Sequence, residues 1–213
     1  METDDRWLLL MQLYMKKPVG VKPIYSKPVV ALSLELHIPP EEIYSSLHSL
    51  RRSDTPLLRR LWARYGNDAR GLAKATRQVR LREGFGSAGA FYDGVQVNEV
   101  FEADFRPAPG CGDIMPMELI LVLDLYFRLI PATMVSETPE VRRLARLMKR
   151  DVTQVVELLA LFRRCDPYLN TTDDTAVDDT PLLQACQSVW RRFANDNPQN
   201  LAALAAQMKE YFG

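Results

Sequence analysis

Histidine and cysteine are scarce in this chain of 213 residues, and their scarcity restricts the chemistry that it can support. The only histidines are His37 and His48, so we do not expect an active site in which imidazoles bind a metal or act as a general base. The three cysteines, Cys111, Cys165 and Cys186, have no CxxC spacing. Free thiols in a reducing compartment are therefore expected, rather than a disulfide framework or a zinc site.

The sequence signatures of common enzyme classes are absent as well. No GxxxxGKS/T, HExxH or GxSxG string occurs, which removes support for phosphate-loop, zinc-protease and hydrolase chemistry. The GxGxxG spacing occurs once, at 84–89, but it follows an expected helix and not a strand, so it does not have the setting of a dinucleotide-binding motif. The aspartates between Asp173 and Asp179 lack the spaced glycine and terminal glutamate of an EF-hand. We therefore predict a protein that is not an enzyme and that binds no metal or cofactor.

Long apolar runs are also missing. No stretch approaches the roughly 18 to 20 apolar residues that a membrane span needs. The N-terminus, Met1 to Asp5, is acidic where a signal peptide would be basic, so we expect a cytoplasmic protein with no membrane partner. The composition, 47% hydrophobic and 25% charged, is that of a globular protein.

The chain contains two related halves. When the first half is laid on the second so that Leu13-Tyr14 falls on Leu125-Tyr126, Leu50-Arg51-Arg52 falls on Phe162-Arg163-Arg164. Further matches pair Ile43 and Leu47 with Val155 and Leu159, and, after a longer loop, Asp54 to Leu58 with Asp179 to Leu183 and 62–68 with 190–196. Because internal repetition sets the architecture, we predict a mainly α-helical protein with two tandem helical repeats. Residues 1–86 form the first and 117–213 the second, joined by 87–116.

Apolar periodicity and proline placement locate the helices. The expected helices are Trp7 to Met15, Pro28 to His37, Pro40 to Arg52 and Arg70 to Arg82 in the first repeat, and Met117 to Arg128, Pro139 to Lys149, Val152 to Arg164 and Leu201 to Phe212 in the second. Between the repeats, residues 90–105 alternate in a β-prone pattern around Asp93-Gly94, which predicts a short hairpin or an extended packing arm. The acidic stretch Thr171 to Thr180 occurs only in the second repeat and is expected to be a surface loop.

Each repeat contains two helices separated by a very short turn, as in a helix-turn-helix unit. In the first repeat, the small residue that packs between the helices is Ser33, the turn is 37–39, and the apolar residues that hold the two helices together are Ile43 and Leu47. In the second repeat, the corresponding positions are Ala145, 149–151, Val155 and Leu159. The stretch Leu34 to Arg52 resembles the helix-turn-helix of sigma-factor-type regulators. It departs at His37, where such motifs usually hold glycine, and the second repeat departs at Arg150, which replaces an apolar turn residue. A helix pair used only for packing is the alternative.

Charge distinguishes the two halves. Residues 1–86 contain fifteen Lys or Arg against nine Asp or Glu, giving +6, whereas residues 87–213 contain twelve against eighteen, giving −6. Most of the positive excess lies between Arg51 and Arg82, and such a cluster attracts phosphate backbones or acidic protein surfaces. The alternative is that these cations line solvated helix faces and pair with the acidic second half.

The candidate nucleic-acid contacts lie on two helices of the first repeat. On the helix expected over 40–52, they are Ser45, Ser46, Ser49, Arg51 and Arg52. On the helix expected over 70–82, they are Arg70, Lys74, Arg77 and Arg80. Hydroxyl groups suit phosphate or base contacts, and a row of cations along one helix face can follow a phosphate backbone. The helix of the second repeat that corresponds to the cationic helix lacks most of this charge.

A longer series in the second repeat resembles the helical module that precedes the nuclease domain in some bacterial HNH-type endonucleases. The matching residues are Leu125-Tyr126, Pro139-Glu140-Val141, Leu144-Ala145, Phe162, Asp166-Pro167, Val189-Trp190, Phe193 and Asp196. The resemblance implies a module that recognises or positions DNA, here duplicated and without the nuclease domain.

These observations together favour a non-enzymatic, DNA-binding and regulatory protein. The first repeat would contact DNA, and the second would form a homo-oligomer or bind a protein partner. The alternative from another class is a protein-interaction or scaffold module with no nucleic-acid role, and a third is a companion subunit of a nuclease system.

Overall fold

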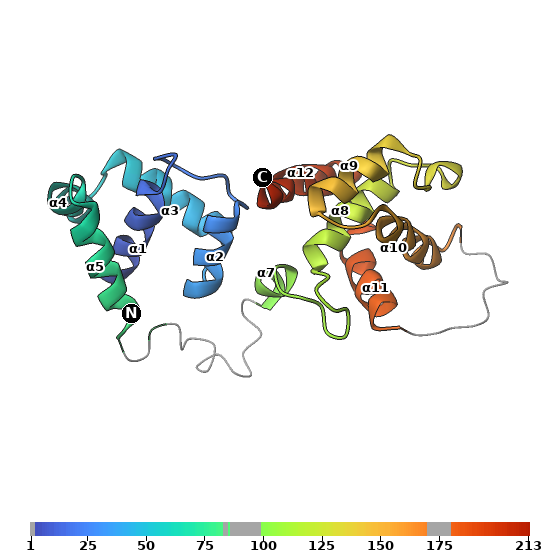
Figure 1. The fold of residues 1–213 in the computed structure, drawn as a ribbon, viewed down its shortest axis with the longest axis horizontal. Coiled ribbons are helices and arrows are strands. Elements are labelled where there is room, and N and C mark those ends of the chain that lie inside the picture. Colours follow the sequence, from blue (N-terminus) through green and yellow to red (C-terminus); the bar gives the residue numbers. More distant parts are fainter. Residues whose placement is uncertain (1–2, 83–84, 86–98, 170–179) are drawn as a thin grey trace. The chain divides into compact units, whose positions relative to one another are not determined.

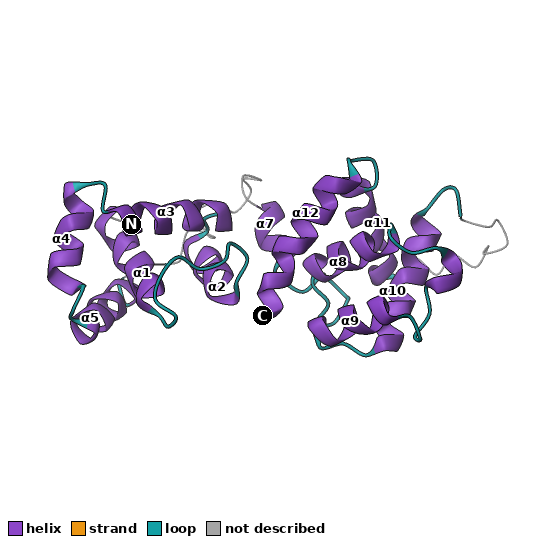
Figure 2. Ribbon diagram, turned by 90° about the horizontal axis from the view of Figure 1, so that it is seen from above, coloured by secondary structure: helices purple, strands orange, loops and turns teal. Residues whose placement is uncertain are grey.

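Each half of the chain folds around one central helix. The computed structural model describes residues 3–82, 85, 99–169 and 180–213, and the chain divides into two units, Met1–Glu99 and Val100–Gly213 (Figure 1). The described residues contain eleven α-helices, two short 3-10 helices and no strand (Figure 2). The predicted mainly α class is therefore confirmed.

Unit 1 consists of five helices. They are α1 (Thr3–Met15), α2 (Lys27–Leu36), α3 (Pro40–Arg52), α4 (Pro56–Tyr65) and α5 (Ala69–Arg80). Helix α1 packs against each of the other four, and its Leu9, Leu10 and Met11 are at most 1% exposed. Because α1 is apolar on most of its circumference, it has to be surrounded, and the four amphipathic helices cover it.

Short polar contacts fix where α4 and α5 begin and how α4 is placed. The side chains of Thr55 and Asp68 cap the first turns of α4 and α5 by accepting from the amides of Leu58 and Gly71. Trp62 of α4 donates from Nε1 to the Leu50 carbonyl at 2.8 Å. These bonds place the helical hairpin α4–α5 beside the end of α3.

Unit 2 begins with a short helix, α7 (Glu99–Asp104). It continues with α8 (Pro116–Tyr126), the 3-10 helix Pro131–Thr133, α9 (Pro139–Met148), α10 (Val152–Cys165), α11 (Pro181–Phe193), α12 (Pro198–Met208) and the 3-10 helix Lys209–Phe212. Every residue of α8 from Met117 to Tyr126 is buried, because α9, α10, α11 and α12 all pack around it. The guanidinium of Arg192 on α11 donates to both oxygens of buried Asp104, at 2.6 and 2.8 Å, and so holds α7 to the unit.

Positions matched between the two repeats perform similar packing roles in the two units. Ser33 and Ala145 are both 0% exposed. Tyr14 packs edge-on against Trp62 with ring centroids 5.6 Å apart, and Tyr126 packs edge-on against Trp190 at 5.8 Å. The apolar spacing identified in the sequence is thus the spacing of each core.

Two expected features fall wholly or partly outside the described residues. The hairpin was predicted over 90–105, and residues 90–98 of it lie outside the described residues. For the remaining part the prediction is wrong, because Glu99–Asp104 is the helix α7. The acidic loop lies outside the described residues at 171–179, and Thr180 is the N-cap of α11. Across the part of the chain that is described, no helix is both long and apolar enough to traverse a lipid bilayer.

Candidate nucleic-acid interface

The turn between α2 and α3 is closed tightly. His37 ends α2 in the left-handed conformation, with φ 54° and ψ 41°. The Ile38 amide donates to the Ser33 carbonyl at 3.1 Å, and the Ser33 hydroxyl donates back to the Ile38 carbonyl. Since left-handed backbone favours glycine, His37 adopts this conformation at some cost in backbone strain.

The outward face of α3 is smaller than the sequence indicated. Ser45 is exposed, but Ser46 is only 8% exposed and accepts a hydrogen bond from Nη2 of Arg6 at 3.0 Å. The same guanidinium pairs with Glu42 at 2.8 Å. The expectation that Ser46 faces outward is therefore wrong, because an arginine from α1 lies against that side of α3.

The N-terminal half of α3 carries carboxylates that bind within the unit. Glu41 accepts from the Tyr25 hydroxyl at 2.5 Å, and Tyr44 packs edge-on against His48 with ring centroids 4.7 Å apart. Ser49 is half-buried. This face therefore offers an anionic ligand little positive charge.

The C-terminal end of α3 is cationic. Arg52 pairs with Asp54 at 2.9 Å across the exposed turn into α4. Arg51 is exposed and has no carboxylate partner among the described residues. Of the two arginines at this end, Arg52 is paired with Asp54, so only Arg51 can pair with an anionic ligand without breaking an ion pair.

Helix α5 separates its apolar and cationic residues onto different faces. Leu72, Thr76 and Val79 are buried against the rest of unit 1. The opposite face carries three exposed cations at positions i, i+4 and i+7, namely Arg70, Lys74 and Arg77, which we call the α5 row. No ion pair to any of the three exists within the described chain.

Arg80 lies on the same helix but has a different role. Its guanidinium donates to both carboxylate oxygens of Glu35, at 2.5 and 3.0 Å, and to the Gln12 side chain at 3.0 Å. The hydrogen bonds to Glu35 raise the pKa of Arg80. Arg80 therefore binds α5 to side chains of α1 and α2. It is not a further member of the α5 row.

Helix α4 adds cations that were not among the nine candidates. Arg60 is exposed with no carboxylate partner in the described residues, and Arg64 lies over the Tyr65 ring at 5.1 Å. Their i, i+4 spacing is visible in the sequence and could have identified Arg60 and Arg64 as further candidate contacts.

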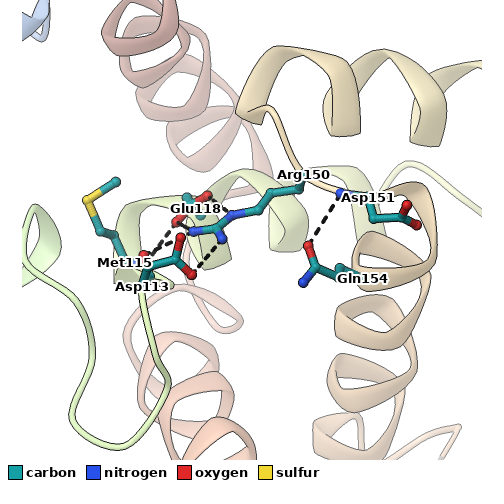
Figure 3. A network of polar contacts seen from close by, with 6 residues as sticks. All are labelled: Asp113, Met115, Glu118, Arg150, Asp151 and Gln154. Atoms are coloured by element: carbon teal, nitrogen blue, oxygen red, sulfur yellow. Dashed lines mark hydrogen bonds and ion pairs between the residues drawn. The ribbon is translucent and has the colours of Figure 1, made fainter.

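The turn between α9 and α10 uses an arginine where the first unit has Ile38. Arg150 donates from Nε and Nη2 to Glu118 of α8 at 2.8 and 3.0 Å, and from Nη1 to Asp113 at 2.7 Å (Figure 3). Glu118 also accepts from the Met115 amide at 2.9 Å. Ion pairs of Arg150 therefore hold this turn against α8, and its charge is not available to a ligand.

The cysteines are unsuited to chemistry at neutral pH. Burial raises the pKa of the Cys165 thiol to about 11 and also raises that of Cys111 and Cys186. Protonated thiols are poor nucleophiles and poor metal ligands. Over the described ranges, no group of three or more His, Cys, Asp or Glu side chains could hold a metal ion.

Comparison with known protein families, curated proteins and solved structures found no match to this chain.

Proposed function

We propose that this protein binds duplex DNA without catalysing a reaction on it, and that the α5 row contacts the phosphate backbone. The observation that carries the proposal is the contrast on α5 between Arg80, which is bound to Glu35, and Arg70, Lys74 and Arg77, which have no carboxylate partner among the described residues. Cations left unneutralised on one helix face are suited to a polyanion.

The length of the α5 row suits a nucleic acid. Arg77 follows Arg70 by seven positions, which is about 10 Å along a helix at about 1.5 Å per residue. That distance is about three base pairs of duplex at 3.4 Å each, so successive cations can approach successive phosphates. Arg51 and Arg60 are further exposed cations of the same unit.

The test is the salt dependence of binding to a short fluorescent duplex. Each phosphate contact contributes about 0.9 to the slope of log K against log salt. Replacing Lys74→Glu together with Arg77→Glu should lower this slope by about 2 and weaken binding at low salt. Arg80 is kept native in this variant, because a carboxylate beside Glu35 would disturb the fold.

A matched control changes the charge by the same amount elsewhere. Arg163→Glu with Arg191→Glu reverses two exposed cations of unit 2 that belong to neither α5 nor the turn pair of unit 1. This control should leave the slope near that of the native chain. If the two double variants bind duplex equally well, the α5 row does not contact DNA.

A protein-interaction role is the second candidate. It is favoured by apolar side chains that unit 2 leaves exposed, among them Ile130 at 65% and Tyr168 at 94%. Under this alternative the chain would form a stable oligomer or a complex with another protein, and no salt-dependent binding to duplex would be found.

A further inference from the structure

Unit 2 carries a second row of exposed cations, on α9. Arg142, Arg146 and Lys149 are exposed at positions i, i+4 and i+7, with Arg143 beside them, and we call these four residues the α9 row. The buried face of the same helix consists of Val141, Leu144, Ala145 and Met148. The α9 row therefore lies on the side of the helix that faces solvent.

The spacing repeats that of the α5 row on a helix that is not its counterpart. The alignment of the two repeats relates α9 to α2, and after the longer loop of the second repeat it relates α12 to α5. The repeat therefore does not account for the two rows sharing an i, i+4, i+7 pattern. The α5 row spans about 10 Å along its helix axis, whereas on α9 Arg142 and Arg146 lie about one turn apart and Lys149 is the C-cap that follows them.

The other cations of unit 2 are largely neutralised, and the α9 row is not. Ion pairs fasten Arg106 to Glu102, Arg128 and Lys209 to Asp124, Arg150 to Asp113 and Glu118, and Arg192 to Asp104. In the α9 row, Arg142 and Arg146 donate from Nε to backbone carbonyls, of Ser136 and of Arg142, at 2.8 and 3.3 Å. Carbonyl groups leave the positive charge in place, and in the described chain no carboxylate forms an ion pair with these four residues.

Three exposed carboxylates, Glu137, Glu140 and Asp151, flank the row in the sequence, and none of them forms an ion pair with it in the described chain. Residues 100–169 and 180–213 contain twelve Lys or Arg and twelve Asp or Glu, so this part of the chain is neutral as a whole. Three of the carboxylates, Asp104, Glu118 and Asp124, are at most 5% exposed. With those acids buried in ion pairs, the four cations of the α9 row exceed the three exposed carboxylates that flank them, so the exposed charge here is positive.

We propose that the α9 row is a second surface for duplex DNA, so that both units contact the phosphate backbone. This inference rests on the proposed DNA binding, and it replaces the expectation that only the first repeat meets nucleic acid. Two contacting surfaces in one chain add their phosphate contacts, which increases affinity and salt dependence together.

The experiment compares three full-length double variants with the native chain. They are Arg146→Glu with Lys149→Glu on α9, Lys74→Glu with Arg77→Glu on α5, and the control Arg163→Glu with Arg191→Glu. The α9 variant should lower the slope of log K against log salt by about 2, as the α5 variant does, and the control should not. Arg142 stays native because it holds the Ser136 carbonyl.

A second measurement needs no substitution. Acylation of Lys149 by an amine-reactive reagent, followed by mass spectrometry, should be slowed by saturating duplex in the native protein. Lys74 reports on the α5 row in the same experiment, and exposed Lys17 serves as the reference. Protection of Lys149 supports the inference even if the charge-reversal variant does not fold.

The outcomes separate this inference from the proposed function. If the α5 variant loses salt-dependent binding while the α9 variant and Lys149 acylation are unaffected, the α9 surface is refuted and the proposed function stands. If only the α9 variant loses binding, the α9 surface stands and the role of α5 is refuted. Binding of the full-length chain to an acidic polypeptide but not to duplex would overturn both.

Discussion

The guanidinium of Arg150 donates two hydrogen bonds to the carboxylate of Glu118, whose side chain is only 3% exposed. The alignment that places Leu13 on Leu125 relates these two positions to Ile38 and Arg6 in unit 1. There Ile38 packs against the apolar core, and Arg6 bonds instead to Ser46 and Glu42. The two units therefore use different polar contacts at the same place in the packing.

Removing one partner of this pair should be more damaging than removing both. Arg150→Met leaves the Glu118 carboxylate buried without its cation, and we expect the free energy of unfolding to fall by about 3 kcal/mol. The double variant Arg150→Met with Glu118→Leu should lose less than the sum of the two single changes, because no buried charge is left unpaired. Urea denaturation followed by circular dichroism measures both values. Strict additivity would contradict the buried pair.

Arg80 and Arg77 should separate stability from DNA binding. Arg80→Ala removes the contacts to Glu35 and Gln12 and should destabilise the protein by about 1 kcal/mol, since the pair is partly exposed. Arg77→Ala removes an exposed cation with no carboxylate partner in the described chain, so stability should change by less than about 0.5 kcal/mol. Affinity for duplex should fall mainly in Arg77→Ala. The reverse assignment would show that Arg80, and not Arg77, is the contact.

Local patterns in the sequence predicted eight of the eleven α-helices of the described residues, but not α4, α7 and α11 and not which polar side chains are available. The limits of α3 were predicted from Pro40 and from the cations at its end, because helix termini depend on neighbouring residues. The burial of Ser46 and the engagement of Arg80 depend on Arg6 and Glu35, which lie 40 and 45 residues away in the sequence. Such partners follow from how the helices pack, which periodicity alone does not specify.

The charge of the second repeat illustrates the same limit. The second repeat was predicted to bind a partner because the helix that corresponds to α5 lacks most of the cations, beside a total of −6 over residues 87–213. Net charge counts buried Asp104 and Glu118 equally with exposed Arg146, although only the exposed group presents its charge to a ligand. The α9 row was present in the sequence as Arg142 to Lys149, and the total concealed it.

Tyr126 should make the stability of unit 2 fall at alkaline pH. Burial, and then the 2.7 Å hydrogen bond to Asp166, raise the pKa of the Tyr126 hydroxyl above its ordinary value of 10.0. A raised pKa means that the folded state keeps a proton that the unfolded state releases. The contribution is therefore complete below about pH 10 and decreases as the pH rises further.

The test is the unfolding free energy measured between neutral and strongly alkaline pH. Tyr126→Phe should reduce the alkaline loss by at most about 1.4 kcal/mol per pH unit, which corresponds to one proton. Tyr168→Phe is the control, because it removes a tyrosine hydroxyl from a side chain that is 94% exposed. If Tyr126→Phe and the native chain lose stability in parallel, the buried hydroxyl is not responsible.

Lys149 combines a strained backbone with a charge in the α9 row, and two substitutions distinguish these roles. It ends α9 in the left-handed conformation, with φ 58° and ψ 38°. Lys149→Gly relieves the strain and should increase the free energy of unfolding by up to about 1 kcal/mol, whereas Lys149→Val should decrease it by about 1 kcal/mol or more. Both changes remove the same positive charge, so their affinities for duplex should fall equally, by about one phosphate contact in the salt slope. If affinity instead followed stability across the two variants, the loss would come from the fold of the turn and not from the charge.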